Sequence, residues 1–166
     1  MTILIDDAGS GDLLHGAVIG AYRVEDDYFI YDLIHPRFFQ NPLYREKRHL
    51  EEAKRIALEL VRRLEPKEGE RIVICSGDIL DGAAEALAEL YGGVVERGHI
   101  EGRCQYLVEA AYEDELRNIG YEPLEERTSK WGKSFWHMYR WLSEDPSRKR
   151  FAKTGFPKLK RYPLFR

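Results

Sequence analysis

The chain has 166 residues, of which 43% are hydrophobic and 33% are charged. This length and balance fit one soluble domain, or one domain with an appendage, and exclude collagenous, disordered and disulfide-framework proteins. The formal net charge of -3 hides an asymmetry. Residues 127–166 contain 12 Lys and Arg against 2 acidic residues, whereas the preceding 126 residues contain 14 against 27. Because net charge bears on association more than on fold, the basic tail predicts a polyanionic partner.

The two cysteines, Cys75 and Cys104, each lie within an apolar run. Two such residues give no disulfide framework, and we interpret them as reduced, buried small hydrophobic residues. No apolar stretch approaches the roughly 20 residues that a membrane span requires. We therefore expect a cytoplasmic protein that does not interact with a membrane.

Three strand-like runs open the chain. Residues 2–5 form a short apolar run that ends in an acidic, glycine-rich string from Asp6 to Asp12. Residues 16–22 resume a β-prone pattern, and residues 28–34 are rich in aromatic and β-branched residues. Short polar turns separate these runs, so we predict an antiparallel meander.

Helices and strands then alternate. The apolar residues of 43–64 recur at helical spacing, and in this phase Glu46 lies one turn before Leu50 on the inward side. The other predicted elements are a buried strand over 72–75, a helix over 82–91, a short strand at 94–95 and a helix over 103–119. The order βββαβαβα indicates an α/β fold with a mixed sheet covered by helices.

The composition shifts to aromatic and basic residues after Pro123. We therefore divide the chain into a domain over 1–122 and a C-terminal extension over 123–166. Helical spacing predicts one further helix in the extension, followed by the basic tail. The residues with this spacing are Trp131, Phe135, Met138, Tyr139 and Leu142.

Acidic residues follow both candidate central strands. Asp6, with Asp7 beside it, closes the first strand, and Asp78 closes the fourth, while Glu46 lies at the start of the first helix. Ligands of open sheets bind beyond the strand ends, so we expect these acids to converge. Converging carboxylates repel each other unless a cation neutralises them, and hard oxygen ligands suit Mg²⁺ or Mn²⁺. Two such ions promote hydrolysis of phosphodiester bonds.

Other interpretations of these acids stay open. Asp78 and Asp81 are also suited to a simple turn and a helix cap. Glu51 or Glu52 is the inward acid if the helical phase differs from the one assumed.

Three short strings follow one another along the chain. They are IDDAGSGDLLHGAVIGAY (5–22), VICSGD (73–78), and Gly98-His99 with RCQYLVEAA (103–111). Together they resemble the ribonuclease H-like superfamily. The first is similar to the Asp-Glu-Ala-Gly-Arg-Gly-Pro opening of type 2 enzymes. The second resembles the type 1 strand ending in Ser-Thr-Asp, and the third the type 1 segment of Gly-His, a loop, Arg-Cys-Asp and an Ala-rich helix.

The resemblance covers about residues 2–119 and implies a metal-dependent nuclease with helices on both faces of the sheet. Asp6, Glu46 and Asp78 would be the catalytic metal ligands, with Asp7 close by. His99 would lie on a mobile loop that assists product release or proton transfer. A surface-loop histidine without a catalytic role is the alternative interpretation of His99.

The chain also departs from the family pattern. Gln105 stands where type 1 enzymes have their last catalytic Asp, so either Glu101 is a fourth metal ligand or metal binding is weakened. Ser10 replaces the Arg of the type 2 signature, although the backbone of Gly9 and Gly11 could still approach a nucleic-acid strand closely.

The tail interleaves cations with aromatic rings. Such cations release counterions from phosphates, and such rings stack on bases. The candidate nucleic-acid-binding cations are Arg148, Lys149, Arg150, Lys153, Lys158, Lys160 and Arg161. In the alternative interpretation the rings pack in the core and the cations neutralise the acidic body or a second subunit.

The sequence thus predicts a nuclease that uses Mg²⁺ or Mn²⁺ and acts on an RNA/DNA hybrid, RNA or structured DNA. A catalytically silent nucleic-acid-binding or assembly module with the same fold is the alternative. A nucleotide phosphotransferase is a weaker third possibility, because the chain is short for a second lobe that closes over a nucleotide.

Overall fold

A five-stranded mixed sheet lies at the centre of the computed structural model, which describes residues 1–166. The strands are β1 (Thr2–Ala8), β2 (Ala17–Arg23), β3 (Tyr28–Ile34), β4 (Arg71–Cys75) and β5 (Val95–Gly98). Their order in the sheet is β3-β2-β1-β4-β5. The predicted α/β fold with a mixed sheet is confirmed.

Strand direction decides which chain segments meet. β1 pairs antiparallel with β2, and β2 pairs antiparallel with β3, as the predicted meander requires. β1 also pairs in parallel with β4, and β4 in parallel with β5. The carboxyl ends of β1, β4 and β5 therefore lie at one end of the sheet, which we call the carboxyl end. The direction in which the sheet grows reverses between β1 and β4, since β2 and β3 follow beside β1 and β5 follows beside β4. Open sheets bind ligands beyond such switch points.

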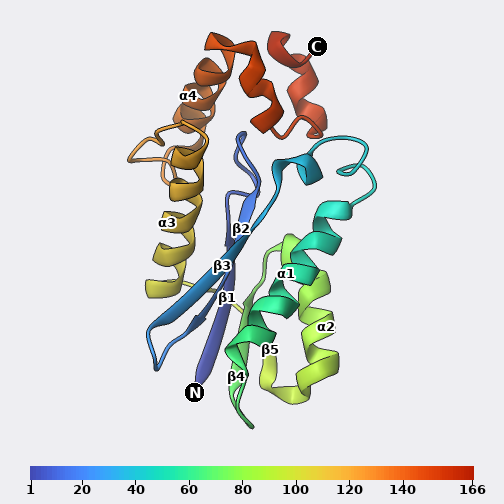
Figure 1. Cartoon of the computed structure of the whole chain (residues 1–166), viewed down its shortest axis with the longest axis vertical. Helices are drawn as coiled ribbons and strands as arrows, with labels where there is room; N and C mark the ends of the chain where they lie inside the picture. Colours follow the sequence, from blue (N-terminus) through green and yellow to red (C-terminus); the bar gives the residue numbers. More distant parts are fainter.

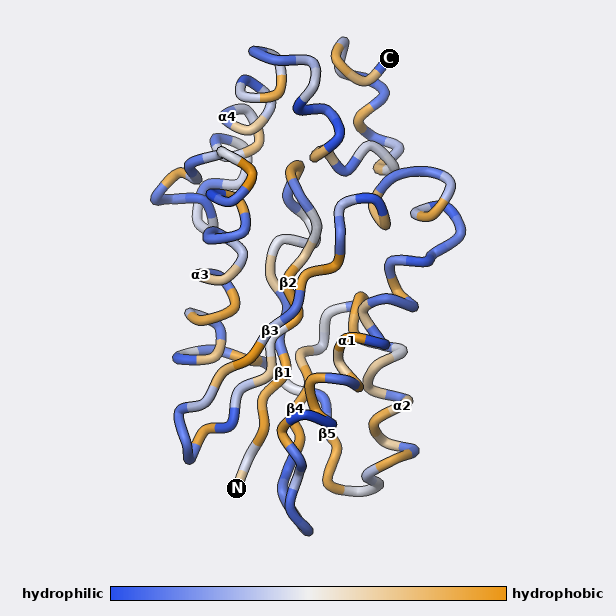
Figure 2. Tube along the Cα trace, viewed as in Figure 1, coloured by the Kyte–Doolittle hydropathy of each residue, from blue (hydrophilic) through white to orange (hydrophobic).

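Helices cover both faces of the sheet. α1 (Arg48–Leu64) and α2 (Asp81–Tyr91) lie on one face, and α3 (Arg103–Asn118) lies on the other (Figure 1). Hydrophobic residues are concentrated in the central strands between these layers (Figure 2). The buried residues of α1 are those predicted from helical spacing: Ala53, Ile56, Ala57, Leu60, Val61 and Leu64. None of the helices is both long and apolar enough to cross a membrane.

The C-terminal segment closes one end of the molecule (Figure 1). It consists of α4 (Trp131–Glu144) and the 3-10 turns Pro146–Phe151, Pro157–Arg161 and Pro163–Phe165. Met138 and Leu159 share a buried core with Leu14, from the connection between β1 and β2. Leu14 also forms an antiparallel bridge with Ala152. Some residues of the expected extension, 123–166, therefore contribute to the buried core of the fold.

Candidate metal centre

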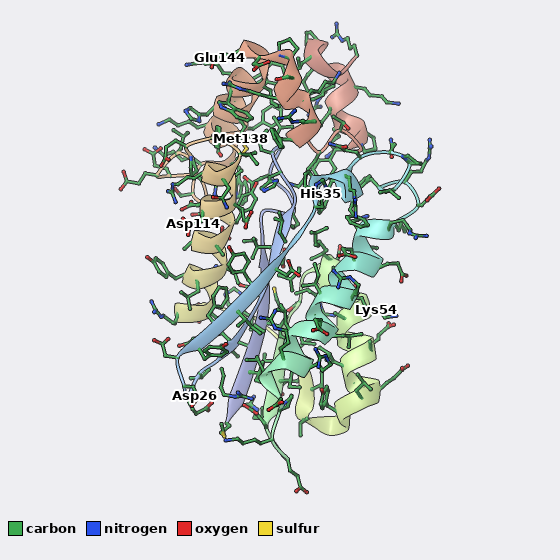
Figure 3. The ribbon with its side chains drawn as sticks, viewed as in Figure 1. Asp26, His35, Lys54, Asp114, Met138 and Glu144 are labelled. Carbon is green, nitrogen blue, oxygen red and sulfur yellow. The ribbon has the colours of Figure 1, made fainter.

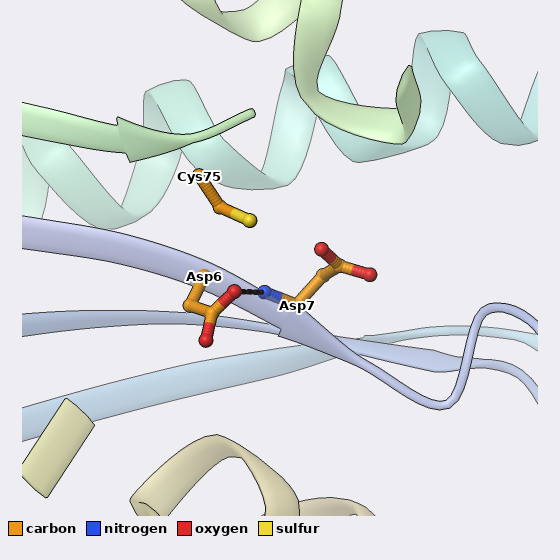
Figure 4. A group of neighbouring side chains, drawn as sticks. All are labelled: Asp6, Asp7 and Cys75. Carbon is orange, nitrogen blue, oxygen red and sulfur yellow. Dashed lines mark hydrogen bonds between the residues drawn. The ribbon is translucent and has the colours of Figure 1, made fainter. Parts of the chain in front are cut away.

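Two adjacent carboxylates lie where β1 reaches the carboxyl end of the sheet. Successive side chains of a strand point to opposite faces, and Asp6 and Asp7 leave β1 in different directions (Figure 4). Asp6 is buried, and its Oδ1 accepts a hydrogen bond from the Asp7 backbone N–H at 2.9 Å. Asp7 is half-buried and accepts a hydrogen bond from the Ser10 hydroxyl at 3.1 Å. These bonds orient both carboxylates.

Cys75, the last residue of β4, completes a group of potential metal ligands (Figure 4). Asp6, Asp7 and Cys75 each offer one ligand atom, and these atoms lie within 4.8 Å of one another. The sequence predicts Cys75 only as a core residue. The parallel register, which pairs Ile5 with Ile74, is what brings Cys75 beside Asp6. No local sequence pattern reveals that register.

Burial changes the proton affinity of all three groups. The pKa of Asp7 is raised to about 6, because burial and the neighbouring charge of Asp6 both disfavour ionisation. Burial also raises the pKa of Asp6, and it raises the pKa of the Cys75 thiol to about 11. A cation between the carboxylates would stabilise their ionised forms. The electrostatics of this group therefore favour a positively charged ligand.

The donor atoms fit a divalent ion through the carboxylates. Carboxylate oxygens suit Mg²⁺ and Mn²⁺, whereas a thiol that stays protonated at neutral pH is a poor ligand for either ion. Asp6 and Asp7 are thus the residues that would hold such an ion. Cys75 would contribute to the binding of a softer metal.

A cleft of about 340 Å³ opens beside Asp7. Asp78 is exposed in the turn after β4 and lines this cleft together with Ser10 and His49. The turn passes close to Asp7, since a Cβ atom added to Gly77 would lie 3.5 Å from Asp7 Oδ1. The structure therefore brings Asp7 and Asp78 to one cleft, although Asp78 is not part of the group whose ligand atoms lie within 4.8 Å.

Glu46 lies outside this site. Residues 41–47 form turns, and α1 begins at Arg48. Lys47 has a φ of 59°, in the left-handed region, which interrupts the helical path before Arg48. Glu46 is exposed in these turns. The prediction of an inward Glu46 is wrong, because the helical phase does not extend back to it.

At the start of α1, His49 lies at the inward position where the sequence predicts an acid. It lines the cleft, and its ring stacks on Tyr44 with the ring centroids 4.5 Å apart. Its Nδ1 atom is buried without a hydrogen-bond partner. The alternative acids do not line the cleft, since Glu51 is exposed and Glu52 pairs with Arg55. The helical spacing selects His49 once the true start of the helix is known.

His99 and Glu101 follow β5 at the carboxyl end of the sheet. Both are exposed, at 79% and 77%, and the distance from His99 Nε2 to the Glu101 carboxylate is 3.6 Å. The His99 charge is one of the influences that lower the pKa of Asp6, although burial outweighs it. Glu101 is not part of the potential metal-binding group. Gln105 is exposed on α3 and lines a different groove.

The glycines after β1 differ in accessibility. Gly9 is buried with a φ of 86°, and a Cβ atom there would clash with the Tyr112 ring. The Tyr112 ring therefore packs against Gly9, and a contact between the Gly9 backbone and a nucleic-acid strand stays a prediction. Ser10 is half-buried against Asp7, and Gly11 is exposed with open space around it.

Most of the predicted phosphate-binding cations are on the surface. Lys149, Arg150, Lys158, Lys160 and Arg161 are exposed. Arg148 is half-buried and lies over the Trp141 ring, 4.3 Å from its centroid. Lys153 is fully buried, and its Nζ donates a hydrogen bond to the Leu14 carbonyl at 2.8 Å. The prediction that Lys153 contacts nucleic acid is therefore wrong, because core residues surround its ammonium group.

A second cluster of charge, which the sequence did not predict, lies beneath the C-terminal segment. Arg127 is fully buried and donates hydrogen bonds to Asp12 at 2.9 Å and to Glu113 at 3.2 Å. It also bonds Glu109. Burial and the nearby charge of Arg127 lower the pKa of Lys153 to about 7, although the charge of Asp12 opposes this shift. We call Asp12, Glu109, Glu113, Arg127 and Lys153 the Arg127 cluster; it joins α3 and the C-terminal segment to the loop after β1.

No family model matches the chain, and no curated protein matches its sequence. The strand order and the geometry at the carboxyl end of the sheet therefore carry the functional inference.

Proposed function

We propose that the protein is a nuclease of ribonuclease H-like fold that hydrolyses phosphodiester bonds with Mg²⁺ or Mn²⁺. One observation carries the proposal: Asp6, which is buried, and Asp7, which is half-buried, form a mutually repelling pair at the switch point of the sheet, beside a cleft that Asp78 also lines. Buried carboxylates of raised pKa in a cleft are typical of functional sites. The strand order β3-β2-β1-β4-β5 supports the same fold family.

The chain's own residues supply binding and orientation. Asp6 and Asp7 would hold the ion, and Ser10 orients the Asp7 carboxylate through its hydrogen bond of 3.1 Å. Asp78 faces the cleft from the turn after β4, where it would bind a second ion or orient a water molecule. When bound, such ions lower the pKa of water and stabilise the oxygens of the attacked phosphate.

Basic residues next to the cleft support a polyanionic substrate. Lys158 and Arg161 line a pocket that shares Tyr44 and Phe156 with the acidic cleft. Exposed cations attract a phosphate backbone, and the buried carboxylates would repel it without a metal ion. The substrate would therefore be held by the cations and cut at the carboxylates. The free thiols Cys75 and Cys104 are consistent with a reducing compartment such as the cytoplasm.

The test compares wild type with Asp7→Asn and Asp78→Asn on labelled RNA/DNA hybrid, duplex, single strand and four-way junction. Each substrate is incubated with Mg²⁺, Mn²⁺ or EDTA. Asp26→Asn is the matched control, because Asp26 lies at the opposite end of the sheet (Figure 3). We expect metal-dependent cleavage by wild type and by Asp26→Asn, and a loss of at least about 100-fold in Asp7→Asn. Equal cleavage by Asp7→Asn and Asp26→Asn would contradict the proposal.

A catalytically silent nucleic-acid-binding module is the second candidate. Two observations favour it. Glu46 and Glu101 are exposed and do not line the cleft, and the neutral Gln105 stands where the family pattern has an acid. The cleft therefore has fewer acidic residues than the family pattern. Binding of nucleic acid without cleavage in either metal would support this candidate over the nuclease.

A further inference from the structure

A second pocket, of about 400 Å³, lies beside the acidic cleft. Rings from three parts of the chain line it: Tyr44 from the turns before α1, Phe135 from α4, and Phe156 and Tyr162 from the C-terminal segment. All four rings are half-buried, so part of each ring faces solvent. We call this site the ring pocket.

The rings form two pairs. Phe135 and Tyr162 have centroids 5.1 Å apart, and Tyr44 and Phe156 have centroids 5.3 Å apart. Both pairs are tilted, at 45° and 59°, and neither is closed into a parallel stack. Tyr44 also stacks on His49, and Phe135 stacks on Tyr139, so these contacts fix the rings while part of each ring stays exposed. The pocket therefore presents rigid aromatic surface at a low cost in conformational entropy.

Two free cations lie at the same pocket. Lys158 and Arg161 are exposed, line the pocket, and form no ion pair with any acid of the chain. Arg161 lies over the Tyr162 ring, 5.3 Å from its centroid. No acidic residue lines the pocket. Its chemistry thus suits a ligand that joins a flat aromatic group to an anion.

The position of the ring pocket decides which such ligand it receives. Tyr44 and Phe156 belong both to this pocket and to the cleft of Asp7 and Asp78. A chain of nucleotides that places one phosphate at the acidic cleft would bring a neighbouring base to the ring pocket. An acidic peptide would satisfy the two cations but would leave the four rings without a flat partner.

We propose that the ring pocket binds an unpaired nucleobase, and that Lys158 and Arg161 bind the phosphate next to it. The inference rests on the proposed function and defines its substrate as single-stranded nucleic acid or a duplex with an unpaired nucleotide. A paired base is excluded because both of its faces are stacked on neighbouring bases. Bases stack on protein aromatic rings without strong sequence preference, so the site selects strand structure and not sequence.

The experiment measures binding in EDTA, so that it does not depend on cleavage. A labelled 12-nucleotide single strand is compared with a strand of equal length whose bases are all replaced by tetrahydrofuran abasic units, and with the corresponding duplex. We expect wild type to bind the base-containing strand about tenfold more tightly than the abasic strand. Equal affinity for these two strands would overturn the inference.

Four variants separate the rings from the cations. Tyr162→Leu and Tyr44→Leu each remove a ring and keep apolar volume, and each should reduce the preference for bases to about twofold or less. Tyr106→Leu is the matched control, because Tyr106 is 64% exposed on α3 and lines a different groove. The double variant Lys158→Gln/Arg161→Gln should weaken binding of both strands by a similar factor. An equal loss of base preference in Tyr106→Leu and Tyr162→Leu would overturn the assignment to this pocket.

Two further readouts complete the test. Circular dichroism and urea unfolding verify that each Tyr variant is folded. Because Tyr44 and Tyr162 lie in different parts of the chain, Tyr44→Leu and Tyr162→Leu test the ring pocket independently. A 12-residue polyglutamate that displaces the strand as well as unlabelled nucleic acid does would overturn the inference. Cleavage by wild type without a base preference contradicts the base site alone, whereas a base preference without cleavage in any metal contradicts the nuclease alone.

Discussion

Two groups of charged residues near the carboxyl end of the sheet are both withdrawn from water, yet they are built differently. In the Arg127 cluster a buried guanidinium faces Asp12, Glu109 and Glu113, so the acids have a cation of the same chain as partner. Asp6 and Asp7 have no cation within salt-bridge distance and are held only by hydrogen bonds.

The difference indicates which group is structural. A buried charge that is paired inside the chain fixes the positions of the elements that carry it, and it needs no ligand. Two ionised acids that are largely withdrawn from water and have no cation are destabilising unless a ligand or a proton neutralises them. We therefore assign the Arg127 cluster to the stability of the fold and the Asp6–Asp7 pair to binding.

The largest effect is expected for Arg127→Met. The substitution leaves Asp12 buried without its ion-pair partner, and breaking a buried pair from one side costs about 3 to 5 kcal/mol. Urea unfolding monitored by circular dichroism measures the free energy of unfolding. Arg117→Met is the control, because Arg117 is 45% exposed and pairs with surface acids, where a loss of about 1 kcal/mol or less is expected. Equal losses in the two variants would contradict a structural role for the Arg127 cluster.

The second effect concerns Asp7→Asn and pH. In the folded protein the pKa of Asp7 is about 6, against an ordinary value of 3.8. Between these values the unfolded state releases its proton first, so the free energy of unfolding of wild type falls as pH rises and levels off above about pH 6. Without metal, Asp7→Asn should match wild type near pH 4 and exceed it by up to about 3 kcal/mol at pH 8. Urea unfolding in EDTA across this range measures the difference, and a constant difference at every pH would contradict it.

A smaller effect is expected at the surface cations. Replacing Lys158, Lys160 and Arg161 by Gln removes three exposed charges and should reduce the slope of log affinity against log salt by about 2 for a single strand. Fluorescence anisotropy at several salt concentrations measures this slope. A triple variant of Lys54, Arg62 and Arg63 on α1 serves as the control and should leave the slope unchanged. A similar change in both triple variants would indicate that the charges act only through the net charge.

The smallest effects are expected for Glu46→Gln and Glu101→Gln. Both side chains are exposed and lie outside the potential metal-binding group. Each variant should retain cleavage within about twofold of wild type and stability within about 0.5 kcal/mol. A large loss of cleavage in Glu46→Gln would restore Glu46 as a ligand that moves toward the cleft when substrate binds.

Local patterns of hydrophobicity and charge were sufficient to locate the main elements of the fold. The apolar, β-prone runs of β1 and β2 and the period of 3.6 in α1 and α3 reveal the strands and the buried faces of the helices, because burial of apolar side chains sets these patterns locally. The acids at the carboxyl ends of β1 and β4 were recognisable from the change of composition after each apolar run, although β1 continues through Asp6 and Asp7 to Ala8. The asymmetry of charge between the body and the tail was also a property of the sequence alone.

Only the tertiary structure decided which charged residues meet. The start of α1 depends on the left-handed Lys47, so the structure replaced Glu46 by His49 at the cleft. The register of β1 on β4 placed Cys75 beside Asp6, and the folding of the tail over the loop after β1 buried Lys153 and Arg127. These outcomes come from contacts between residues far apart in the chain, and local patterns of hydrophobicity and charge do not record such contacts.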